Sequence, residues 1–453
     1  MRIAVCGVGL TGLVTAVVLC EFGHSLFCHD INPQFAENLR NIGFSEPGLT
    51  ELVTHHQNKG TLHFIPNLSE ALKDIDAIFV TIPVKGEDGQ DMDLSSLIKL
   101  FSEISSYLQT DKYLPIFIKT TLPVGTSAII ANNMSQMRPD LLMGVHYDII
   151  SNPNFMREGS AIHDLMKPDR IIFGLSQLAF RKLDCSAKTL IENVFSPLKH
   201  LNIPFLYTNY ETAELIKSAT MGLVTIKMAY ANEIEQLCNN VGVDLQVLLK
   251  GIGSDRRISS DSLLFNAGIG GSSLPRTSRL LIDSAKKFGT ELSILSTALE
   301  SNDRRIQSIS KKVLRYFHEN FKCSDQKVAI FGISFKPLTD DVRESPSLSV
   351  IRDLLRNKIK VSLYDPYYSS KPFNVQNIPY DIMSNNDFSI CSSAYNAVSM
   401  SDAIVVMTSW PQFRELDMNK IRELMVHSKH TPLLFDCNNM FRDYESTFQY
   451  IAA

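Results

Sequence analysis

The chain has 453 residues, more than one hydrophobic core can organise, so we expect two or three domains. It is 44% hydrophobic and 20% charged, as ordinary globular proteins are, and its net charge of −4 argues against a polybasic nucleic-acid-binding surface. No apolar run is long enough to span a membrane, and the eight cysteines form no CxxC pair that would indicate a metal site. No charged and apolar leader precedes the first strand, so we expect a cytoplasmic protein. From the charge, the apolar runs and the cysteine spacing together, we expect no nucleic-acid partner, no membrane partner and no bound metal.

Short apolar runs alternate with helical patterns over the first two hundred residues. The runs are RIAVCGV (2–8), SLFCHDI (25–31), AIFVTIP (77–83), LPIFIKTT (114–121), LLMGVHY (141–147) and RIIFGL (170–175). Such runs predict a parallel β-sheet with helices on both faces. Residues 209–240 contain no proline and keep a helical period, which predicts one long helix.

Strand patterns return at 327 with KVAIFGISF, followed by KVSLYDP, AIVVMTS and PLLFDC. The chain therefore has an α/β, then mostly α, then α/β plan. We predict a first domain over 1–208, a central helical domain over 209–322 and a third domain over 323–453.

A glycine turn follows the first predicted strand. Gly7, Gly9 and Gly12 have the G-x-G-x-x-G spacing ahead of a helical pattern, and Asp30 ends the second strand. In dinucleotide-binding folds the glycines admit a pyrophosphate at the helix N-terminus, and the carboxylate binds the ribose hydroxyls. Because a carboxylate repels a 2′-phosphate, Asp30 favours NAD over NADP. The alternative is a glycine-bearing turn in an unrelated α/β domain.

With these residues located, several further segments resemble the UDP-glucose/GDP-mannose dehydrogenase family, in family order over nearly the whole chain. They include EPGLTELV (46–53), KTTLPVGT (119–126), SNPNFMREGSA (151–161), AELIKS (213–218), GIGGSSLPR (268–276) and GISFKPLTDDVRESPS (332–347). The resemblance implies an N-terminal Rossmann-like domain that binds NAD, a central α-helical dimerisation region and a C-terminal Rossmann-like domain that binds a UDP- or GDP-sugar. It also implies a homodimer or higher homo-oligomer.

The resemblance also assigns ligand contacts. The cofactor residues would be Gly7, Gly9, Gly12, Asp30, Thr121, Glu158, Arg276 and Arg343. The substrate residues would be Phe155, Arg257, Gly270 and Lys336, with Arg257 reaching the site of the partner subunit. The glycine pair at 270 and 271 would let backbone approach a ligand closely.

At the reacting centre the sequence departs from the family pattern. Such enzymes oxidise a primary alcohol to a carboxylate in two hydride transfers, with a cysteine that traps the intermediate aldehyde. Here Ser273 stands at the cysteine position, and a serine hydroxyl is a far weaker nucleophile than a thiolate. Thr277 and Asn154 stand where the family has carboxylates, whereas the site lysine is kept as Lys217.

Three functions follow from this pattern. The first is a dehydrogenase that stops after one hydride transfer, with Lys217 stabilising an oxyanion. The second is the full oxidation with Ser273 as a slow nucleophile, which lacks a neighbouring base. The third is a non-catalytic homologue that binds NAD or a nucleotide-sugar.

Purely structural roles also fit several of these residues. Lys217 could be a solvated charge on a helix, and Ser272 and Ser273 could cap the following helix. The VRESP segment around Arg343 could start a helix with Pro346 in its first turn, which is compatible with a ligand contact.

Overall fold

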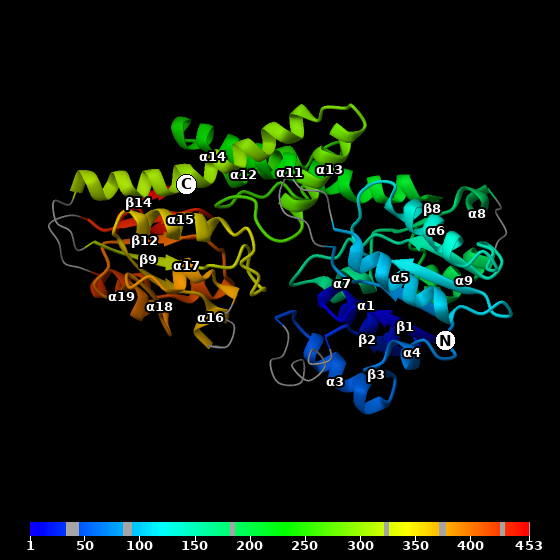
Figure 1. Cartoon of the computed structure of the whole chain (residues 1–453). Coiled ribbons are helices and arrows are strands. Elements are labelled where there is room, and N and C mark those ends of the chain that lie inside the picture. Colours follow the sequence, from blue (N-terminus) through cyan, green and yellow to red (C-terminus); the bar gives the residue numbers. More distant parts are fainter. Residues whose placement is uncertain are drawn as a thin grey trace. The chain divides into compact units, whose positions relative to one another are not determined.

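A computed structural model of the chain describes residues 1–32, 45–84, 93–181, 186–320, 326–370, 377–425 and 431–452. The chain forms two compact units: residues 1–220 with 283–288, and residues 221–282 with 289–453. Figure 1 shows the elements of both units, coloured along the sequence. The three-domain division stays a prediction, and its boundary at 322/323 lies outside the described residues.

The first unit is built on an eight-stranded sheet of order β3-β2-β1-β4-β5-β6-β7-β8. Its strands are β1 (Arg2–Cys6), β2 (Ser25–His29), β3 (Leu62–Phe64), β4 (Ala77–Val80), β5 (Leu114–Ile118), β6 (Tyr147–Ser151), β7 (Ile171–Leu175) and β8 (Phe205–Asn209). All neighbours pair in parallel except β6 and β7. The pairs Ile3↔Leu26 and Ile3↔Ala77 place β1 between β2 and β4. The strand order reverses there, and doubly wound sheets bind ligands at the carboxyl end of the strands at such a point.

Helices cover both faces of this sheet and bury one apolar cluster on each face. They are α1 (Leu10–Glu21), α3 (Leu49–Lys59), α4 (Leu68–Ala71), α5 (Ser95–Tyr107), α6 (Thr126–Met137), α7 (Ala161–Met166), α8 (Gln177–Arg181), α9 (Ser186–Val194) and α10 (Ser196–His200). Phe79 on β4, Phe117 on β5 and Phe173 on β7 are fully buried in one cluster and meet Phe195. Every residue of these three strands is buried, which explains why they read as continuous apolar runs.

The second unit carries a six-stranded parallel sheet of order β11-β10-β9-β12-β13-β14. Its strands are β9 (Lys327–Phe331), β10 (Lys360–Tyr364), β11 (Phe388–Ile390), β12 (Ala403–Val406), β13 (Leu433–Asp436) and β14 (Gln449–Ala452). Its own helices are α12 (Leu245–Gly253), α14 (Ser293–Asn320), α15 (Pro346–Arg356), α16 (Pro366–Ser370), α17 (Tyr380–Met383), α18 (Ala394–Val398) and α19 (Met418–Leu424), with two short 3-10 turns at Pro411–Glu415 and Arg442–Tyr444.

Two further helices, α11 (Tyr210–Val241) and α13 (Leu274–Lys287), contribute residues to both units. Helix α11 matches the long helix predicted over 209–240, and the two parallel sheets confirm the predicted α/β class. One expectation was wrong: the run at 141–147 is not a strand. Gly144 turns the chain there with φ +85°, its N–H donates to the Tyr147 carbonyl at 2.8 Å, and β6 begins only at Tyr147.

Candidate functional site

The turn after β1 explains the spacing of its glycines. Gly7 has φ +102°, and its N–H donates to the His29 carbonyl at 2.8 Å. A Cβ on Gly12 would lie 2.0 Å from the Gly7 carbonyl oxygen, so only glycine fits where α1 packs on the turn. A Cβ on Gly9 would meet nothing within 4 Å. Gly9 therefore borders open space at the N-terminus of α1, where a pyrophosphate would sit.

Asp30 lies at the same turn, at the end of β2. One carboxylate oxygen accepts the Val8 N–H at 2.7 Å and the other accepts the Asn32 N–H at 3.0 Å. The side chain stays half-buried. The structure thus brings all four residues of the predicted glycine motif together, with a partly exposed carboxylate beside the turn.

A cationic cluster lies beyond the carboxyl ends of the strands of this unit. The Lys217 ammonium is 5.0 Å from the centre of the Phe155 ring, and the Arg170 guanidinium carbon is 4.4 Å from it. Lys217 is buried, and burial together with the positive charge of Arg170 lowers its pKa to about 8. The burial of Lys217 excludes a solvated surface charge, and its ammonium has no hydrogen bond or carboxylate partner among the described residues of its unit.

Asn154 precedes this ring, and its side-chain oxygen accepts the Met156 N–H at 3.2 Å. The amide therefore supports the local turn. Thr121 and Glu158 are half-buried in loops that follow β5 and β6, the two neighbouring strands.

Glu214, one helical turn before Lys217 on α11, anchors the loop that contains Thr121. Its carboxylate accepts the Gly125 N–H at 2.6 Å, the Ser127 N–H at 2.8 Å and the Ser127 hydroxyl at 2.7 Å. Burial raises the pKa of Glu214 to about 7. The same loop contains the buried Lys119, which donates to the Asn152 side-chain oxygen at 3.1 Å and whose pKa burial lowers to about 8.

In the second unit, the glycine pair of the 268–276 loop packs against protein. A Cβ on Gly270 would lie 2.6 Å from the Glu344 carbonyl oxygen, and one on Gly271 would lie 2.6 Å from the Phe335 ring. Gly271 has φ +87° and donates to the Arg343 carbonyl at 3.0 Å. Both glycines are required by close packing against the loop after β9. Their approach to a ligand stays a prediction.

Ser273 is exposed directly before α13, and its backbone carbonyl accepts the Thr277 N–H at 2.9 Å. This is the helix-start position that serine was expected to occupy. Thr277 is buried one turn into the helix.

The remaining predicted ligand residues of the second unit are cations. Arg343 is paired with Asp341 at 2.7 Å, just before α15, where Ser345 caps the helix and Pro346 opens it as predicted. Arg257 is 86% exposed and paired with Asp255 at 2.6 Å. Lys336 lies 5.6 Å from the Phe335 ring centre, and Arg276 is half-buried on α13.

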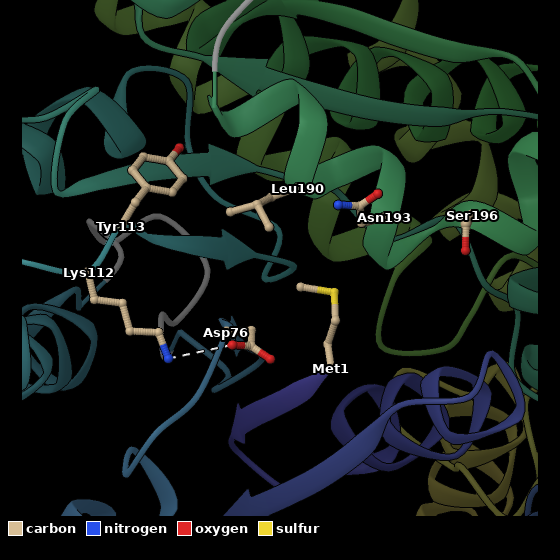
Figure 2. A pocket seen from close by; sticks show the side chains of 7 residues that line it. All are labelled: Met1, Asp76, Lys112, Tyr113, Leu190, Asn193 and Ser196. Carbon is tan, nitrogen blue, oxygen red and sulfur yellow. Dashed lines mark ion pairs between the residues drawn. The ribbon is translucent and has the colours of Figure 1, made fainter.

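Each unit also contains a cavity. A cavity of about 320 Å³ is lined by residues such as Met1, Asp76 and Tyr113 (Figure 2). These residues immediately precede β1, β4 and β5, so the cavity lies at the amino edge of the sheet, opposite to where such sheets bind ligands. A larger cavity of about 590 Å³ in the second unit is lined by Arg279, Arg343 and Arg352, among others.

Three domains of one family match successive parts of the chain. The NAD binding domain of the UDP-glucose/GDP-mannose dehydrogenase family matches residues 1–198, its central domain matches 211–304, and its UDP binding domain matches 329–443. The chain belongs to this family. The match confirms the predicted resemblance and NAD as the cofactor.

Relatives of this dehydrogenase family align over almost the entire chain. A UDP-glucose 6-dehydrogenase of Rhizobium meliloti is 32% identical over 98% of this chain and 97% of its own length. One from Pseudomonas aeruginosa is 31% identical over 97% of this chain and 94% of its own. The solved UDP-glucose dehydrogenase of the archaeon Pyrobaculum islandicum superposes with a TM-score of 0.83 at 26% identity, covering 98% of this chain and 95% of that one. No helix in the described ranges has both the length and the apolar character needed to cross a membrane.

The sequence did not single out four charged residues that the structure places in specific contacts: Glu46, Lys119, Arg170 and Glu214. Glu46, Lys119 and Glu214 belong to EPGLTELV, KTTLPVGT and AELIKS, segments that carried the resemblance, and Arg170 begins the apolar run RIIFGL. A charged residue inside an apolar motif is the signal that could have found them, since buried charges need specific partners.

Proposed function

We propose that the protein is an NAD-dependent nucleotide-sugar dehydrogenase that removes one hydride from a sugar carbinol and releases the carbonyl product. The observation that carries this proposal is the buried Lys217 beside Phe155 and Arg170, in the unit that also holds the glycine turn and Asp30. An unpaired ammonium in a buried site can stabilise an alkoxide strongly, because little water screens it.

The residues of the turn fit a dinucleotide: Gly9 borders open space at the start of a twelve-residue helix, and Asp30 is partly exposed. NAD, when bound, accepts the hydride. Around it, Thr121 and Glu158 would orient the cofactor, with Arg276 and Arg343 contributing charge. Lys217, whose pKa is about 8, can take the hydroxyl proton when neutral and then face the forming carbonyl oxygen as an ammonium. One C–H bond and one O–H bond break, and one hydride and one proton leave.

A second oxidation would need a covalent adduct or a hydrated aldehyde that a base activates. Ser273 lacks the acidity of a thiol, and neither Thr277 nor Asn154 can accept a proton at neutral pH. Asn154 is also engaged with the Met156 N–H. We therefore assign one hydride transfer per substrate.

We assign the substrate as a UDP- or GDP-sugar bound through Phe155, Gly270 and Lys336, with Arg257 contributed to a second subunit. The match of the UDP binding domain supports the nucleotide part. We keep the three-domain division at 208/209 and 322/323, which agrees with the order of the matched family domains.

We further propose a homo-oligomer that associates through α11. Leu223, Tyr230, Leu237 and Val241 are 49–62% exposed at spacings of seven, seven and four residues, so they form one apolar stripe on the helix. A continuous stripe of this kind on a long helix favours a helix partner. Replacing Leu237 with Glu should produce a smaller species in sedimentation analysis, and Lys250→Glu on the neighbouring helix is the control that should not.

The test of the activity is to count NADH formed per nucleotide-sugar consumed, with UDP- and GDP-sugars, and to identify the product by mass spectrometry. One NADH and an aldehyde or ketone is the expected result, and Lys217→Met should reduce the rate at least about a hundredfold. Two NADH and a uronate would refute the single transfer. Binding of NAD and sugar with no NADH across the panel would favour the second candidate, a non-catalytic binding homologue, which the engaged Asn154 already supports.

A further inference from the structure

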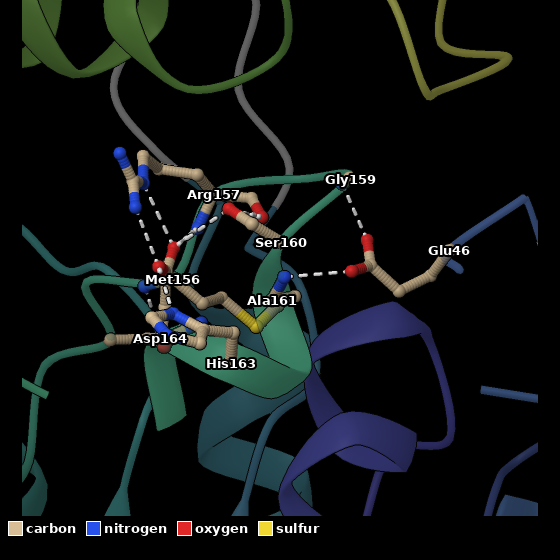
Figure 3. A network of polar contacts seen from close by, with 9 residues as sticks. Glu46, Met156, Arg157, Gly159, Ser160, Ala161, His163 and Asp164 are labelled. Carbon is tan, nitrogen blue, oxygen red and sulfur yellow. Dashed lines mark hydrogen bonds and ion pairs between the residues drawn. The ribbon is translucent and has the colours of Figure 1, made fainter. Parts of the chain in front are cut away.

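Glu46 connects the start of α3 to a loop more than a hundred positions away in the sequence. Its side chain is 4% exposed. One carboxylate oxygen accepts the Gly159 N–H at 2.6 Å and the other accepts the Ala161 N–H at 2.7 Å (Figure 3). The sequence separations are 113 and 115 residues. A single buried carboxylate thus holds two amides at the start of α7.

A second carboxylate holds the other side of the same loop. Asp164 accepts the Arg157 N–H at 2.8 Å and pairs with the Arg157 guanidinium at 2.7 Å, and the Ser160 hydroxyl donates to it at 3.2 Å (Figure 3). Glu158 lies between Arg157 and Gly159, so its backbone is fixed from both directions. Phe155, which contacts Lys217, is three residues upstream.

We propose that Glu46 is a positioning residue that holds the 155–161 loop so that Glu158 and Phe155 face the ligands. The inference rests on the proposed function for the roles of those two residues. Its physical basis is the match of two carboxylate oxygens to two N–H donors that lie two residues apart, since hydrogen bonds to an ionised acceptor are the strong ones. Glu46 acts through the loop, by way of the N–H groups of Gly159 and Ala161.

The test uses Glu46→Gln in the full chain. A glutamine amide has only one oxygen, so its NH₂ group must oppose the N–H of Gly159 or Ala161. We expect amide hydrogen exchange in 156–161 to accelerate and the Kd for NAD to rise about tenfold, the size of one such bond. Asp148→Asn is the matched control. Asp148 is also a buried carboxylate of this unit, but within the described part of the chain it accepts the Tyr113 hydroxyl alone, at 2.7 Å, so its substitution should leave both readouts unchanged.

Non-additivity separates positioning from general stability. If Glu46 acts through Glu158, then adding Glu46→Gln to a Glu158→Gln chain should weaken NAD binding no further than Glu158→Gln alone. Full additivity of the two effects would overturn the proposal, as would faster exchange with an unchanged Kd. Should Glu46→Gln fail to fold, Asp164→Asn with the same readouts replaces it, because it releases the opposite side of the loop.

The outcome is independent of turnover. A wild-type chain that binds NAD but produces no NADH would refute the proposed function, while exchange and affinity would still decide the role of Glu46. If NAD leaves exchange in 156–161 of the wild type unchanged, the loop does not face the cofactor and this inference fails.

Discussion

The two parallel sheets start with the same turn. Gly7 follows β1 with φ +102° and donates to the last residue of β2, and Gly332 follows β9 with φ +91° and donates to the last residue of β10, both at 2.8 Å. In each unit an aspartate comes next after the second strand, Asp30 or Asp365, and accepts N–H groups from the turn. The strand orders around these turns are also equivalent.

The two aspartates differ in how much of the carboxylate is exposed to a ligand. Asp30 is half-buried and accepts two backbone N–H groups. Asp365 is fully buried and accepts the N–H groups of Ile333, Ser334 and Tyr367 and the Trp410 indole N–H at 3.1 Å. Of these two aspartates only Asp30 keeps an exposed part, which is what the proposed contact with a ribose requires. Topology alone therefore does not identify a dinucleotide site; the exposure of the strand-end carboxylate does.

The largest effect should come from Gly12→Ala. The new methyl would overlap the Gly7 carbonyl oxygen, so the first unit should lose about 3 kcal/mol or more of stability and its NAD binding. Denaturant unfolding and calorimetry would measure this. Gly9→Ala, whose methyl meets open space, should keep the fold; equal loss of stability in both variants would contradict the packing argument.

The next test exchanges each aspartate for asparagine. Asp365→Asn should destabilise the chain by about 2–4 kcal/mol, because five donors, the Ser334 hydroxyl included, then have a single amide oxygen as acceptor. It should leave NAD affinity intact. Asp30→Asn should instead weaken NAD binding about tenfold or more with a smaller loss of stability. The comparison breaks down if Asp365→Asn is the variant that weakens NAD binding.

The pH dependence of NADH formation probes the cationic cluster. The proposed mechanism uses the neutral form of Lys217 as a base, so the rate should rise with pH through about 8. Arg170→Met removes a positive neighbour, which raises the pKa of Lys217 and moves the rising limb to higher pH. Rates over about pH 6.5–10 would measure the shift. Arg138 pairs with Asp140 on the surface, so Arg138→Met is the control that should not move the limb. A limb that stays in place would exclude Arg170 from this role.

The smallest effect is expected at Asp148. Burial raises its pKa from 3.8 to about 6, so the folded chain holds this proton more tightly than the unfolded chain. The resulting stability is present below pH 4 and is lost as pH rises through 6. Asp148→Asn removes that loss, and its advantage over the wild type in thermal unfolding should grow by about 1–3 kcal/mol between pH 4 and pH 8.

Local patterns were enough to predict much of the fold. Apolar runs located most of the strands, and glycine spacing with Asp30 predicted the dinucleotide turn. What the pattern could not predict was how distant residues pair. Glu46 holds amides 113 and 115 positions away, and Arg170 reaches the ring beside Lys217 from the segment before β7. Nor does the sequence distinguish Asp365 from Asp30, since their difference is burial by Trp410, which lies 45 residues further along.

Trp410 is the single tryptophan of the chain, and its indole N–H donates to Asp365 inside the second sheet. Its fluorescence therefore comes from one unit alone. Denaturation followed by tryptophan emission records the loss of the C-terminal core, whereas circular dichroism records both units together. A difference between the two midpoints would divide the stability of the chain between its halves without cutting it.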